Sequence, residues 1–189
     1  MIDKSVEVSG SLLEVEIKAR VQNTDEIREH LLLRHATPSE RVHERDVYFN
    51  APDRDFGVTD EALRLRYTEG RCVLTYKGPK MKAYRLKARE ELNTAVESGT
   101  VVETLFTRLG YRKVAEVEKW REYFEYRGAS VCLDEVIGLG SFVEIEAPPG
   151  SGKSDPEKFV REIAAELGVE GEPILLSYLE LLLGKESHD

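Results

Sequence analysis

Apolar and polar residues alternate at every second position through many short segments of the chain. A period of two is typical of β-strands that bury one face. Glycine-containing turns at 69–70, 127–128 and 138–141 separate neighbouring segments, so we expect an antiparallel sheet. The pattern predicts eight strands, over residues 12–21, 45–50, 62–67, 72–77, 85–92, 118–126, 130–136 and 142–146.

Other segments repeat their apolar residues with helical spacing or carry signals of a helix end. Gly110 follows one such segment, and Asp155 and Pro156 open another. No linker or repeat divides the 189 residues, so we expect one α+β domain over 1–189. Helices are predicted over 24–35, 98–109, 155–168 and 177–183.

Charge and composition exclude several classes of protein. Lys and Arg number 27 against 36 Asp and Glu, a net charge of -9, which argues against a nucleic-acid partner. The most apolar stretch, 174–183, is about half the length of a membrane span. The first ten residues do not resemble a signal peptide, and Cys72 and Cys132 lack the spacing of a zinc or disulfide framework. We therefore expect a soluble cytoplasmic protein without a membrane partner, and a homodimer stays open.

The polar side of the predicted strands is almost purely charged. Glu14, Glu16 and Lys18 alternate with apolar residues on one strand, and Arg64 and Arg66 do so on another. One interpretation is a solvated outer face with cross-strand ion pairs. The other is a closed barrel whose charges point inward, because eight strands suffice for closure and the helices need an apolar sheet face to cover. The pattern as a whole favours the charged interior.

Charges inside a barrel need partners, because an unpaired buried ion costs several kcal/mol. A polyanion held by the bases, with divalent metals held by the carboxylates, would supply them. Hard oxygen ligands without a Cys or His cluster suit Mg²⁺ or Mn²⁺. The candidates for the interior are nine bases (Lys18, Arg64, Arg66, Lys77, Arg85, Lys87, Arg89, Lys119 and Arg121) and six acids (Glu14, Glu16, Glu91, Asp134, Glu144 and Glu146), a surplus of three positive charges.

The same residues form a series of motifs. Glu14 to Lys18 read E-x-E-x-K, and Phe142 to Glu146 read F-x-E-x-E. Together with the motifs between and after them, these segments resemble the CYTH superfamily, the triphosphate tunnel metalloenzymes, and most closely its class IV adenylyl cyclase-like branch. The other motifs are Asp46-Val-Tyr-Phe49, Leu63-Arg-Leu-Arg66, Leu74-Thr-Tyr-Lys-Gly-Pro79, Arg89-Glu-Glu91, Lys119-Trp-Arg121, Leu133-Asp-Glu-Val136, Gly138-Leu-Gly140 and Ser177-Tyr178.

The resemblance implies an eight-stranded antiparallel tunnel that binds a triphosphate with a divalent metal. It assigns Arg85 and Lys87 no role. For these two residues we expect a solvated or structural position as readily as a position in the binding site. By motif position it implies metal-binding carboxylates at Glu14, Glu16, Glu144 and Glu146 with Asp134 beside them, phosphate-binding bases at Lys18, Arg64, Arg66, Lys77, Arg89, Lys119 and Arg121, and a catalytic set of Glu14, Glu16, Lys18, Arg121 and Asp134.

The reaction is left open between two forms of triphosphate chemistry. Some cyclases of this class carry a His-Phe pair shortly before E-x-E-x-K, where this chain has Ser11 to Leu13. Some triphosphatases of the family carry a lysine just before the C-terminal tyrosine, and residues 173–177 contain none. We expect conversion of ATP to cyclic AMP and pyrophosphate, and the alternative is hydrolysis of inorganic, thiamine or nucleoside triphosphate. A non-catalytic polyphosphate- or nucleotide-binding module is a further alternative.

Gly150 to Ser154 read G-S-G-K-S and superficially suggest a phosphate-binding P-loop. That signature needs a glycine five residues before Gly152, where the chain has Ala147. Two prolines follow Ala147 and have no amide hydrogens for a phosphate. We therefore interpret this segment as a solvated linker.

Overall fold

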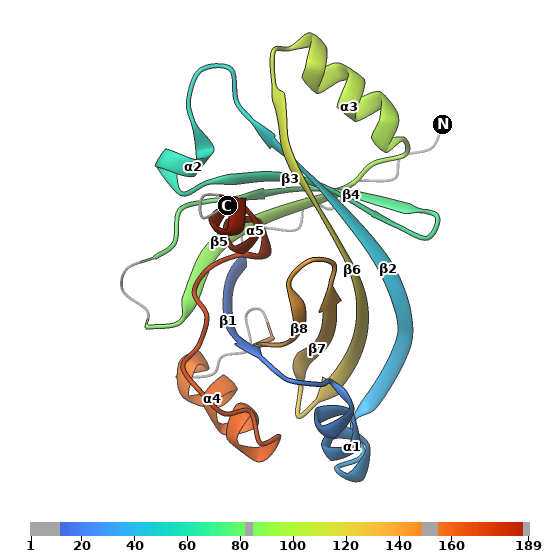
Figure 1. Cartoon of the computed structure of the whole chain (residues 1–189), viewed down its shortest axis with the longest axis vertical. Helices are drawn as coiled ribbons and strands as arrows, with labels where there is room; N and C mark the ends of the chain where they lie inside the picture. The colour runs from blue at the N-terminus through green and yellow to red at the C-terminus, as the bar shows by residue number, and fades with distance from the viewer. Residues whose placement is uncertain (1–11, 82–84, 149–154, 187–189) are drawn as a thin grey trace, which may run out of the picture.

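The computed structural model describes residues 12–81, 85–148 and 155–186. Its eight strands close into an antiparallel barrel, in the order β1-β5-β4-β3-β2-β6-β7-β8 and back to β1 (Figure 1). The predicted fold class is therefore confirmed. The strands are β1 Leu12–Arg20, β2 Thr37–Asn50, β3 Ala62–Thr68, β4 Arg71–Lys77, β5 Lys87–Ala95, β6 Arg112–Tyr126, β7 Ala129–Val136 and β8 Gly140–Glu146.

Two strands are much longer than the alternation predicted. β2 starts at Thr37 instead of residue 45, and β6 starts at Arg112 instead of 118. The early part of β2 is exposed, so no apolar alternation marks it in the sequence. Conversely, β5 begins at Lys87, and Arg85 is exposed outside it.

The helices are α1 Asp25–Leu33, α2 Phe56–Thr59, α3 Gly99–Arg108, α4 Pro156–Glu166 and α5 Tyr178–Glu186. Four match predicted segments, whereas the four-residue α2 was not predicted. The Asp155 side chain caps α4 by accepting a hydrogen bond from the Lys158 N–H at 2.9 Å, and Pro156 occupies the first turn.

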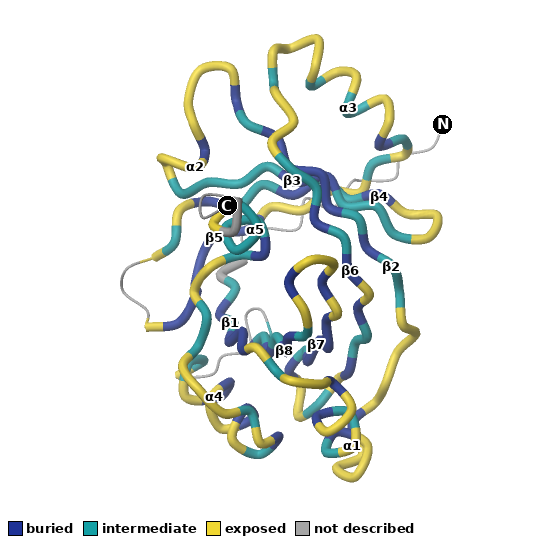
Figure 2. The backbone as a smooth tube through the Cα atoms, viewed as in Figure 1, coloured by how far each residue is buried: buried dark blue, intermediate teal, exposed yellow. Residues whose placement is uncertain are grey.

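Apolar packing on the outside of the barrel turns the charged strand faces inward. Ile27 and Leu31 of α1, and Val160 and Ile163 of α4, share one buried cluster with outward-facing strand residues such as Ile145. Figure 2 shows the buried sides of these helices facing the barrel. The charged side chains on alternate positions therefore point to the interior.

The last helix packs differently, at one end of the barrel. Tyr178 at the start of α5 shares a buried cluster with Tyr48, Val117, Val136 and Phe142, which lie on the inward side of their strands. The Tyr178 and Phe142 rings lie with centroids 5.0 Å apart, edge to face. Because these contacts lie across the barrel interior, α5 closes this end of it.

Three further predictions from the sequence concern other parts of the chain. No helix within the described ranges is long and apolar enough to cross a membrane. Cys72 and Cys132 are buried free thiols, as the absence of a disulfide framework led us to expect. The G-S-G-K-S segment falls in 149–154, outside the described residues.

Candidate functional site

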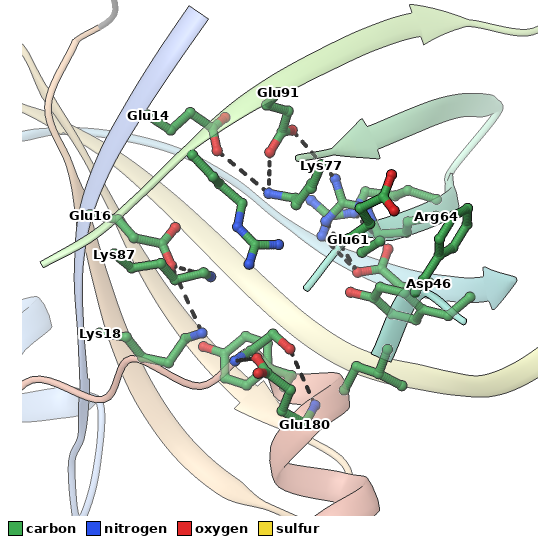
Figure 3. Close-up of a pocket in the computed structure, with 18 of the residues that line it drawn as sticks. Glu14, Glu16, Lys18, Asp46, Glu61, Arg64, Lys77, Lys87, Glu91 and Glu180 are labelled. Atoms are coloured by element: carbon green, nitrogen blue, oxygen red, sulfur yellow. Dashed lines mark hydrogen bonds and ion pairs between the residues drawn. The ribbon is translucent and has the colours of Figure 1, made fainter. Parts of the chain in front are cut away.

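The barrel encloses a cavity of about 530 Å³ lined by charged side chains from strands all around it (Figure 3). Every predicted metal- or phosphate-binding residue lines this cavity except Asp134, which lies buried behind Arg121. Lys87 lines it too, although its motif position left it undecided. The structure therefore brings all of the predicted binding residues except Asp134 together around one interior space.

The expected surplus of three positive charges is wrong. Arg85 is exposed outside the barrel, and two acids left out of the predicted interior set are buried against the interior bases: Glu44, and Asp46 of the Asp46-Val-Tyr-Phe49 motif. Eight bases thus face eight acids. Each of these bases has an acidic partner within 4.0 Å, which for Arg89 is Asp60 at the rim.

One wall of the tunnel, formed by β1 and β8, is mainly acidic, and Lys87 at the start of β5 lies beside it. The strand register places Glu16 opposite Glu146, and Lys18 opposite Glu144. Lys87 donates to Glu16 at 2.6 Å, and Lys18 lies 3.1 Å from Glu144. These ammonium groups separate carboxylates that would otherwise repel one another.

Crowding on this wall shifts the acidity of two carboxyl groups. Burial, followed by the neighbouring charges of Glu91 and Glu146, raises the pKa of Glu14 to about 8, although Lys77 at 3.4 Å opposes the shift. Burial and the charge of Glu16 raise the pKa of Glu146 to about 7. Near neutral pH, the metal-free wall therefore retains protons that a divalent cation would displace.

The protons retained by these carboxyl groups predict how the stability of the metal-free protein depends on pH. Because the folded-state pKa of Glu14 lies above its unfolded value, the folded chain binds more protons between about pH 5 and 7.5, and unfolding free energy falls as pH rises. We expect the melting temperature of metal-free protein to fall across that range and Glu14→Gln to flatten the slope. Thermal melts in chelator, with the exposed Glu29→Gln as the matched control, measure this. An unchanged slope in Glu14→Gln contradicts the assignment.

The opposite wall is basic, and it is held in place by Glu44 and Asp46, the two acids left out of the predicted interior set. Arg66 forms a two-pronged pair with Asp46, both contacts at 2.7 Å, and lies 3.0 Å from Glu44. Lys119 also reaches Glu44 at 3.3 Å. The longer period-two run of β2, in which positions 44 and 46 share a face, was the signal that could have found them.

Two arginines of the interior have a hydrogen-bond donor that is not used. Among the buried guanidinium nitrogens of the described residues, those without a hydrogen-bond partner are the Nε atoms of Arg64 and Arg89. Arg64 otherwise donates to Thr75 at 3.1 Å and lies 3.6 Å from Asp46. A buried donor without a partner is costly, so these two groups are suited to an anionic ligand.

Asp134 differs from the other predicted carboxylates because it is not part of the cavity lining, and both of its oxygens are taken. Arg121 donates from Nε at 2.6 Å and the Tyr178 hydroxyl donates at 2.7 Å, with Asp134 fully buried. Arg121 also contacts Glu144. Asp134 thus fixes a basic side chain and the start of α5 in one arrangement.

The donor set on the acidic wall fits a hard divalent cation in its chemistry. Glu14, Glu16, Glu144 and Glu146 offer carboxylate oxygens without histidine or thiolate nearby, except Cys132, whose thiol pKa burial raises to about 11. In the described part of the chain, no three acids, histidines or cysteines are already grouped round one metal position. A cation would therefore replace lysine ammonium groups as the partner of these carboxylates.

Comparison with known proteins agrees with this geometry. The CYTH domain family matches residues 12–174. A Methanocaldococcus jannaschii protein called "Putative adenylate cyclase MJ0240" is 34% identical over 174 residues, which are 90% of this chain and 98% of that protein. The structure of PH1819 from Pyrococcus horikoshii OT3 is 39% identical with a TM-score of 0.80, over 91% of this chain and 99% of that one. The Hippeastrum protein HpAC1, 14% identical with a TM-score of 0.66 over 92% and 96% of the two chains, shares the fold.

Proposed function

Because the chain belongs to the CYTH domain family, we propose that it binds a nucleoside triphosphate with a divalent metal in the tunnel and converts ATP to cyclic AMP and pyrophosphate. The observation that supports this most is the division of the interior into an acidic and a basic wall across one cavity. A polyphosphate and its counter-cation match the two walls at once.

The basic wall and the residues beside it would bind the phosphates. Arg64 and Arg89 offer unused Nε donors, while Lys18, Lys77, Lys119 and Arg121 are the further bases of the proposed site. Guanidinium groups suit phosphate oxygens because they donate two parallel hydrogen bonds. We propose that Asp134 holds Arg121 in position and is not itself a metal ligand.

Glu14, Glu16, Glu144 and Glu146 would hold Mg²⁺ or Mn²⁺. When bound, such a cation neutralises phosphate charge and makes the ribose hydroxyl more acidic. The ribose 3′-oxygen would form a bond to the α-phosphorus and its proton would pass to solvent water, while the bond from that phosphorus to the oxygen bridging to the β-phosphate would break and release pyrophosphate. The basic side chains would stabilise the departing pyrophosphate.

Two observations favour cyclisation over hydrolysis. Residues 174–183, which include the segment leading to Tyr178 and most of α5, contain no lysine or arginine that could orient water at a terminal phosphate. The 34% identical relative bears a cyclase name. The missing His-Phe pair before Glu14 is the observation that favours hydrolysis, so the test must separate the two products.

Incubation of the protein with ATP and Mg²⁺ or Mn²⁺ should yield cyclic AMP and pyrophosphate in equal amounts, measured by chromatography. Heat-treated protein and EDTA are the controls. ADP with orthophosphate, or cleavage of inorganic triphosphate without a cyclic product, would identify a triphosphatase in the same tunnel. Tight binding of ATP without any product would identify a binding module.

A further inference from the structure

A second cavity, of about 450 Å³, lies at the end of the tunnel away from α5. It shares Tyr123, Ser130 and Glu146 with the tunnel cavity, so the two spaces meet at these residues. Ser130 and Glu146 are also the inward residues farthest along β7 and β8 from the apolar contacts of α5, and Tyr123 lies three inward positions beyond Val117 on β6. The volume lies within the range of small-molecule sites.

The lining changes in character between the two cavities. More than half of the described residues around the tunnel cavity are charged, whereas in the second cavity only Glu125 and Glu146 are. Hydroxyl groups of Thr37, Ser39 and Ser130 take their place, beside the Tyr123 ring. This lining offers no cation to a phosphate and suits a neutral group with hydrogen-bonding edges.

The other end of the tunnel suits such a group poorly. The start of α5 is fixed there by the Tyr178–Asp134 hydrogen bond, and Lys18 donates to the Leu176 carbonyl at 3.1 Å. Beside α2, the cavity lining mixes the carboxylates of Asp60 and Glu61 with apolar residues such as Phe56 and Val114. A neutral organic group would have to displace these contacts or lie among these acids.

On the basis of the proposed function, we propose that the second cavity holds the nucleoside of the substrate. The triphosphate then extends into the tunnel towards α5, with the phosphate nearest the ribose at the junction beside Glu146. In this orientation the ribose hydroxyls and the α-phosphate lie at the carboxylate that both cavities share.

The test compares ATP with inorganic triphosphate, which has no nucleoside. Ser130→Phe narrows the junction, and Ser39→Trp fills the exposed rim of the second cavity, where bulk does not disturb the core. In calorimetric titrations with Mg²⁺, both variants should bind ATP at least tenfold more weakly and inorganic triphosphate within twofold of wild type. The comparison variant, Val114→Trp, adds a ring at an exposed position on the α2 side of the tunnel cavity and should change the affinities for ATP and inorganic triphosphate by the same factor.

Three results would overturn the proposal. Unchanged ATP affinity in both second-cavity variants would place the nucleoside elsewhere. A loss of affinity for ATP but not for inorganic triphosphate in Val114→Trp would place the nucleoside on the α2 side. An equal loss of affinity for ATP and for inorganic triphosphate in Ser39→Trp and Ser130→Phe would mean that the cavity admits phosphate only. Failure of the wild type to bind either ligand would instead refute the proposed function, which keeps the two failures distinguishable.

Discussion

Replacing Glu146 with glutamine should reduce metal-dependent turnover of ATP by at least about a hundredfold while leaving the fold intact. The amide keeps the shape of the side chain but removes an anionic ligand for the cation. Glu146 is suited to this test because its pKa is raised to about 7 by burial and by the nearby carboxylates. Removing it relieves repulsion, so the metal-free variant should melt no lower than wild type.

Steady-state rates at limiting Mg²⁺, together with melting curves in chelator, measure both effects. Glu118→Gln is the matched control, because Glu118 lies on the outer side of β6 beside His43. Turnover near the wild-type value in Glu146→Gln would remove this residue from the metal site. A large fall in melting temperature would show that it acts in folding.

Inorganic triphosphate should stabilise the wild type strongly, and Arg64→Ala should lose most of that stabilisation. A ligand at about 100 times its dissociation constant adds about 2.7 kcal/mol to unfolding free energy. Arg64 is chosen over Arg66 because its buried Nε is unused, whereas removing Arg66 would strand Asp46. Loss of a charged donor in a buried site weakens anion binding directly.

Melting curves with and without inorganic triphosphate and Mg²⁺ measure this shift. Arg41→Ala provides the control, because Arg41 pairs with Glu135 at 2.7 Å on exposed surface. Its shift should equal that of the wild type. If Arg64→Ala keeps the full shift, the arginine has a structural role only.

The inward-facing residues could be predicted because successive side chains of a strand point to opposite faces. The parity of a residue's number, odd or even, therefore decides which face of its strand it occupies. Glu14, Glu16 and Lys18 share one side of β1 wherever the strand begins, so an error in its ends does not move them. Parity alone could not decide Arg85, which shares the parity of Lys87 but precedes β5. The prediction failed there because it depended on the strand boundary.

Other parts of the site depend on contacts that no local pattern contains. Glu44 and Asp46 lie after an exposed, polar start of β2, so the alternation that identifies a half-buried strand begins too late to include Glu44. The Tyr178 hydrogen bond to Asp134 joins residues 44 positions apart. The sequence predicted a short apolar helix after Ser177, but only the closed barrel shows that it covers an end.

Each interior base already has an acidic partner, and this pairing has a consequence for how ligands affect one another. A polyphosphate that takes the bases leaves carboxylates without partners, and a cation that takes the carboxylates leaves lysines without theirs. Each ligand therefore removes part of the cost of binding the other. The two should bind with positive cooperativity, and by thermodynamic reciprocity Mg²⁺ should strengthen triphosphate binding by the same factor by which triphosphate strengthens that of Mg²⁺.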